Sequence, residues 1–128
     1  MSGETNQSFF DWLRRQTQKR VGRDYIFQEL DPVKTAVVNV DMQHYFMSPG
    51  YQAACPMSLT IIPQLNLLCE KVRESGGVII WVQTTADTYA TDNWKTYEEL
   101  HSPERWARRS IELAESHKGF KLHPDLDV

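Results

Sequence analysis

The segment from Thr35 to Phe46 reads T-A-V-V-N-V-D-M-Q-H-Y-F and organises the rest of the chain. Up to Val40 it is almost entirely small or β-branched and apolar, which is typical of a strand buried on both faces of a parallel sheet. The run turns polar at Asp41. A carboxylate just after a buried strand lies where open α/β sheets hold their ligand crevices, so Asp41 is a candidate functional residue. The alternative is that Asp41 only begins a turn.

A second buried strand is predicted over residues 78–82, which read V-I-I-W-V. Between the two strands, a helix with a regular apolar stripe is expected to begin near Thr60. Pro63 would fall in its first turn, where the missing N–H does no harm, and Gly76-Gly77 would end it. A strand, a helix and a second strand form a βαβ unit. The two strands should therefore be parallel neighbours.

Residues 1–31 are predicted to form an N-terminal helical arm and connector, and residues 32–128 the main domain. The arm helix is expected over Ser8–Arg20, with Ser8 at a capping-box-like start. Because its basic side chains share one face in an acidic chain, we interpret that face as solvated rather than as an anion site. The aromatic-rich arm should pack on its own domain or on a neighbouring subunit.

The second half of the main domain contains a predicted helix that begins at Ser102, with Pro103 at its first position. We expect this helix to run to about Ser116, followed by an extended tail over residues 118–128. Residues 86–101 are polar and aromatic, which predicts a loop-rich segment that covers the crevice.

Composition limits the class of protein. The chain has 128 residues, of which 41% are hydrophobic, as expected for one small globular domain. Its net charge of -3 does not suggest nucleic-acid binding. No apolar run approaches the ~20 residues of a membrane span, and no secretory signal opens the sequence. Two cysteines form no disulfide framework. These features predict a cytoplasmic protein without a membrane or nucleic-acid partner.

The run A-V-V-N-V-D-M-Q-H-Y-F resembles the first strand and active-site turn of the isochorismatase-like cysteine hydrolases, in which such a strand ends in Asp-Met-Gln. The run V-I-I-W-V-Q after a helix that ends in Gly also resembles this family. The resemblance covers residues 32–128. It implies a three-layer α/β/α fold with a parallel, Rossmann-like sheet, of which this chain encodes only the first half.

The resemblance also implies site residues. Asp41 matches the family's general base. Five positions match or neighbour residues that line the substrate pocket: Gln43, Tyr45, Phe46, Trp81 and Gln83. For Trp81 the alternative is a core aromatic, and for Phe46 it is packing beneath the loop.

Family members use an Asp, a Lys and a Cys, and only the Asp is matched here. The lysine pattern K-x-x-[YF]-S-[AG]-F and the nucleophile pattern T-G-x-x-T-N-x-C-V do not occur, and Lys118-Gly119-Phe120 does not match the former. Cys69 is interpreted as a core residue of the first helix. Cys55 is interpreted as incidental. A reactive Cys55 near Asp41 is the alternative.

The resemblance predicts cofactor-free hydrolysis of a C–N bond in a small amide or ureido compound. One alternative is an isochorismatase-type vinyl ether hydrolase. Another is a catalytically incomplete homologue that serves as an oligomerisation or binding module. No catalytic metal is predicted, because His44 is the only histidine near the motif. We expect a homo-oligomer, or a second chain that carries the Lys and Cys, because two strands cannot complete a parallel sheet. The alternative is that the remainder of a longer or cleaved chain supplies them.

Overall fold

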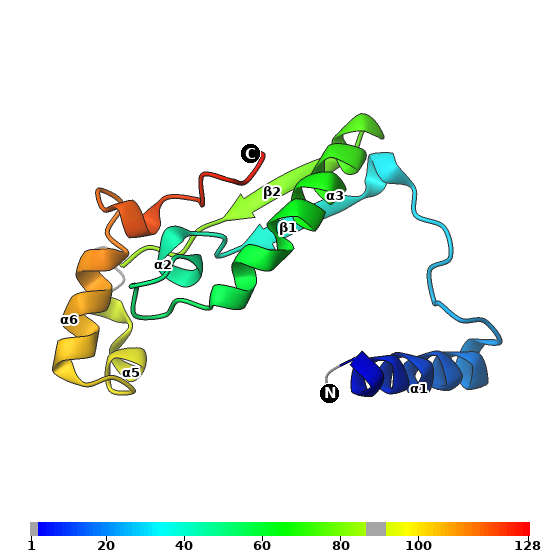
Figure 1. The fold of residues 1–128 in the computed structure, drawn as a ribbon, viewed down its shortest axis with the longest axis horizontal. Helices are drawn as coiled ribbons and strands as arrows, with labels where there is room; N and C mark the ends of the chain where they lie inside the picture. Colours follow the sequence, from blue (N-terminus) through cyan, green and yellow to red (C-terminus); the bar gives the residue numbers. More distant parts are fainter. Residues whose placement is uncertain (1–2, 87–91) are drawn as a thin grey trace. The chain divides into compact units, whose positions relative to one another are not determined.

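The computed structural model describes residues 3–86 and 92–128 and divides the chain into two compact units, Met1–Asp31 and Pro32–Val128. The first unit consists of helix α1 (Gly3–Val21) and a connector without helix or strand (Figure 1). Because α1 starts well before Ser8, this residue lies inside the helix, and its predicted role as the N-cap is wrong. None of the helices in the described ranges combines the length and the apolar character that a bilayer crossing requires.

The second unit is built on two parallel strands, β1 (Ala36–Val40) and β2 (Val78–Val82). Helix α3 (Ile62–Glu74) links them and lies along the sheet (Figure 1). This arrangement confirms the predicted α/β class and the parallel pairing. Gly77 is required at the entry to β2, since a Cβ there would lie 2.6 Å from a methyl of Val72.

The sheet has one covered face and one open face. On the covered face, Asn39 is buried and its Nδ2 donates to Sγ of the buried Cys69 on α3, 3.8 Å away. The opposite face carries apolar side chains that are between 41% and 56% exposed, namely Val38, Val40, Val78, Ile80 and Val82. Within the second unit, the predicted burial on both faces is therefore found on one face only, because no described element of this unit covers the other.

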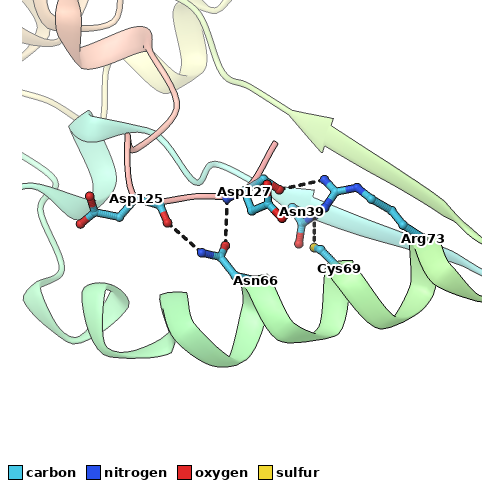
Figure 2. Close-up of polar contacts among 6 residues, drawn as sticks. All are labelled: Asn39, Asn66, Cys69, Arg73, Asp125 and Asp127. Atoms are coloured by element: carbon cyan, nitrogen blue, oxygen red, sulfur yellow. Dashed lines mark hydrogen bonds and ion pairs between the residues drawn. The ribbon is translucent and has the colours of Figure 1, made fainter.

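The last residues of the chain dock against α3 instead of extending freely. Figure 2 shows Asn66 on α3 bridging two points of this segment: its Nδ2 donates to the Asp125 carbonyl at 2.8 Å, and its Oδ1 accepts from the Asp127 N–H at 3.0 Å. Arg73 adds a bond to the Asp127 carbonyl at 2.8 Å. Leu126 is buried between these anchors, in a cluster with Met47 and Ile62. The C-terminal segment is thus part of the core.

Short helices complete the unit. Helix α2 (His44–Met47) follows the turn after β1, a 3-10 helix η2 (Pro56–Ile61) precedes α3, and α5 (Lys95–Glu98) precedes α6 (Pro103–Glu112). A further 3-10 turn, η3 (Lys118–Phe120), contacts α2 and α6.

Helix α6 begins as predicted, because the Ser102 hydroxyl accepts from the Arg105 N–H and Pro103 occupies the first position. It ends at Glu112, before the predicted Ser116. Of the predicted loop over 86–101, residues 87–91 lie outside the described residues. Its role as a cover over the crevice stays a prediction.

Candidate active site

Asp41 directly follows β1 and adopts a left-handed backbone conformation, with a φ of 59°. Few residues with a side chain adopt this conformation, and Asp is among those that tolerate it best. The Asp41 N–H donates to the Val82 carbonyl at 2.9 Å, which extends the parallel ladder one residue beyond β1. The half-buried carboxylate accepts a 2.7 Å hydrogen bond from the Thr84 hydroxyl. The strand end and this hydroxyl together fix where the carboxylate lies.

Gln43 is fully buried, two residues after Asp41, and its side-chain amide is hydrogen-bonded to backbone groups. Its Nε2 donates to the Thr84 carbonyl at 2.9 Å and to the Phe120 carbonyl at 2.7 Å. Its Oε1 accepts from the Thr84 N–H at 2.8 Å. Both amide N–H groups are therefore occupied, and a substrate could reach them only by displacing the protein backbone. The predicted substrate contact remains untested, and the geometry favours a positioning role for Gln43.

Gln83 and Trp81 come from β2 and its carboxyl end. The half-buried Gln83 donates from Nε2 to the Phe120 carbonyl at 2.8 Å, so this one carbonyl receives bonds from Gln83 and Gln43. Trp81 packs against the cluster that contains Met47. This packing favours the core interpretation of Trp81. The bond to Phe120 uses one of the two amide hydrogens of Gln83. The pocket roles of both residues stay predictions.

Tyr45 and Phe46 lie on α2, in contact with each other. Tyr45 is 2% exposed and packs with Ala86 and Leu113, while Phe46 meets its ring edge-on at a centroid distance of 4.9 Å. Burial raises the pKa of the Tyr45 hydroxyl above its ordinary value, and the positive charge of Arg109 partly opposes that rise. The two rings therefore support the turn from beneath, which is the alternative interpretation of Phe46.

His44 is buried at the start of α2, between the site and the C-terminal segment. Its Nδ1 shares a 2.7 Å hydrogen bond with the Ser48 hydroxyl, and its ring lies 5.1 Å from that of His123. Burial lowers the pKa of His44 below 6.5, and the positive charge of Lys118 and the nearby His123 ring lower it further. The charge of Asp125 acts in the opposite direction. The imidazole is thus held in its neutral form near pH 7.

Neither cysteine has the surroundings expected of an activated catalytic nucleophile. Cys69 is fully buried and bonded to Asn39, as expected for a core residue, and Cys55 is an exposed free thiol in the loop before η2. In residues 3–86 and 92–128, no three side chains of the His, Cys, Asp or Glu type gather as a metal site would require. The prediction that no metal takes part in the reaction remains a prediction.

The site also includes residues that the sequence analysis did not select. The Thr84 hydroxyl bonds the Asp41 carboxylate, and the Phe120 carbonyl joins the two glutamines. Thr84 could have been found, because it lies two residues beyond β2 at the same sheet edge as Asp41. Phe120 gave no signal, since a backbone carbonyl can belong to any residue type.

A parallel sheet with a fixed carboxylate at its carboxyl edge is typical of α/β proteins, which bind their ligands at that edge. The isochorismatase domain matches this chain over residues 35–128, which is more than two-thirds of its length. The chain therefore belongs to the isochorismatase domain family, and it is a member of the hydrolases of the isochorismatase-like superfamily. Comparisons with curated proteins and with solved structures found no match. The predicted family is confirmed.

We expect Gln43→Ala to lower the free energy of unfolding by about 2–4 kcal/mol, because it removes the side-chain partner of the Thr84 N–H and carbonyl and one of the two donors to the Phe120 carbonyl. Gln83→Ala is the matched control. It removes one half-buried bond to the same carbonyl and should cost about 0.5–1.5 kcal/mol. Urea unfolding followed by circular dichroism measures both values. Equal losses in the two variants would contradict the positioning role of Gln43.

The free energy of unfolding should fall as the pH falls from about 6.5 towards the lowered pKa of His44. In that window the unfolded chain binds a proton at residue 44 that the folded chain does not, so acid favours unfolding. Above pH 6.5 this contribution is fully present. Urea titrations at pH 5.5, 6.5 and 7.5 measure the slope, and His44→Gln should make it shallower. An unchanged slope in the variant would show that another group is responsible.

Proposed function

We propose that this chain carries the general base of a cysteine hydrolase, with Asp41 as that base. The reaction is the cofactor-free hydrolysis of a C–N bond in a small amide or ureido compound. One observation carries the proposal: the half-buried Asp41 carboxylate stands at the carboxyl edge of a parallel sheet and is held there by Thr84. A base must be held in a fixed position relative to the proton that it takes, and the bond from Thr84 supports the proposal because it fixes the Asp41 carboxylate.

The chemistry assigns the other roles. Asp41 accepts the proton of a cysteine thiol, and the resulting thiolate attacks the carbonyl carbon of the substrate. The same carboxyl group then returns the proton to the leaving amine, and water hydrolyses the acyl-enzyme. A lysine beside the pair favours the charged forms of both groups. Substrate contacts are proposed from Gln83 and from the turn that holds Gln43, Tyr45 and Phe46, with Trp81 at the rim.

The lysine and cysteine patterns do not occur in residues 1–128, so we propose that a second polypeptide, or the remainder of a longer or cleaved chain, supplies them. The open face of the sheet supports this proposal. Val38 is 54% exposed and Ile80 is 41% exposed, although parallel sheets are ordinarily covered on both faces. An uncovered apolar sheet also invites association through its face and edges. A second copy of this chain or a different chain could cover it, and only a chain with the lysine and cysteine would complete the reaction.

Replacing Asp41 with Asn should reduce turnover by about 10²–10⁴-fold, the usual contribution of a general base. Asn also tolerates the left-handed backbone and can accept the Thr84 hydrogen bond, so the fold should persist. The assay uses the enzyme purified together with its partner polypeptide, on ureido acids, carbamoyl amines, nicotinamide and isochorismate. Turnover of isochorismate alone would instead indicate a vinyl ether hydrolase.

The control for this variant is Glu70→Gln, which removes one exposed carboxylate from α3 and should leave turnover unchanged. Circular dichroism of both variants shows whether the fold is retained. Full turnover in Asp41→Asn would exclude this residue as the base.

The chain purified alone should sediment as species larger than its mass of 14.9 kDa, because the open sheet face buries itself in association. Val38→Lys on that face should shift sedimentation towards the monomer. Leu67→Lys, at an equally exposed apolar position on α3, is the control and should not. A folded monomer at every concentration, without a copurifying chain, would contradict the proposal.

A further inference from the structure

Helix α6 carries a buried cation that the proposed reaction does not use. Arg109 is 4% exposed, and its guanidinium carbon lies near three aromatic rings. The distances to the ring centroids are 5.1 Å for Tyr97, 5.5 Å for Trp106 and 5.9 Å for Trp94. Trp94 and Tyr97 come from α5 and the residue before it, and Trp106 lies one turn before Arg109 on α6. We call Arg109 and these three rings the Arg109 cage.

One buried nitrogen of this guanidinium has no hydrogen-bond acceptor among the residues that the structure describes. Nη1 of Arg109 is buried, and no atom of residues 3–86 and 92–128 accepts from it. Glu112, the acid three residues further along, is bonded instead to Nε of Arg108 at 2.8 Å and to the Gln52 N–H at 3.3 Å. Arginine is charged in proteins, so a buried guanidinium is a buried charge that needs partners.

The rings satisfy only part of what a buried guanidinium requires. The faces of Trp and Tyr rings attract a cation, which explains why the charge can be buried here. A ring face, however, does not replace the oxygen lone pair that a buried N–H group needs, and an unpaired buried donor is costly. An anionic oxygen would supply the missing acceptor through a charge-assisted hydrogen bond.

We propose that the Arg109 cage binds a small organic carboxylate. A carboxylate matches the planar donor geometry of arginine, and the aromatic walls favour a flat, apolar body over a strongly hydrated ion. Trp94 is half exposed, so the cage borders solvent at that ring. The proposal does not depend on the hydrolase reaction, since Asp41 takes no part in it.

Benzoate is the probe, because it combines a carboxylate with a flat ring. Isothermal titration calorimetry of the full chain at pH 7 should show saturable binding of benzoate, and binding of the neutral benzamide should be at least about tenfold weaker. Arg109→Gln should weaken benzoate binding by about tenfold or more. Arg105→Gln removes an exposed arginine from the same helix and should bind benzoate like the unchanged chain.

A second variant covers the case in which Arg109→Gln fails to fold, as judged by circular dichroism. Trp94→Ala removes one half-exposed wall of the cage and should weaken benzoate binding at least about threefold. Three results would each overturn the proposal: no saturable binding of benzoate to the unchanged chain, equal affinity for benzamide, or unchanged affinity in Trp94→Ala.

Discussion

The amide of Gln43 joins three parts of the chain that are far apart in sequence. It holds the turn after β1, the exit of β2 at Thr84 and the C-terminal segment at Phe120 through three hydrogen bonds of 2.7–2.9 Å. Because Gln43 is fully buried, its amide does not have water as an alternative partner. The Asp41 carboxylate is bonded to the same Thr84, so its position depends on this junction. The arrangement of the candidate site therefore follows from the hydrogen bonds that the buried Gln43 amide requires.

One face of the sheet is covered and the other is exposed, and this difference links the fold to the proposed function. On the covered face, Asn39 finds its partner in Cys69, and the C-terminal segment closes over α3. On the other face, side chains such as Val40 remain about half exposed. Apolar β-branched residues on that face have a clear physical reason only if another polypeptide covers them. The open face and the unmatched lysine and cysteine therefore support the same proposal, that a further polypeptide segment completes both the sheet and the site.

The local elements could be predicted from the sequence because their causes are local. Apolar runs mark β1 and β2, and Ser102-Pro103 marks the start of α6. The same applies to Asp41, whose place at the end of a strand is visible in the sequence. The hydrogen-bond partner of the Gln43 amide could not be predicted, since the Phe120 carbonyl lies 77 residues away in the sequence. Sequence patterns also do not distinguish a glutamine that meets a substrate from one that bonds to the backbone.

Gln43 and Arg109 are both buried polar side chains that need hydrogen-bond partners, but only Gln43 has all of its amide hydrogens bonded among the described residues. Both side chains are polar and at least 96% buried. Gln43 directly precedes α2, which carries Tyr45, and Arg109 lies on α6, where its charge opposes the rise in the pKa of Tyr45. For Gln43, every amide hydrogen has an acceptor, which makes a purely structural role sufficient to explain its burial. For Arg109, aromatic rings surround the charge while Nη1 has no acceptor among the described residues. Since burial is costly without such a partner, complete bonding argues for a structural role and incomplete bonding for a ligand.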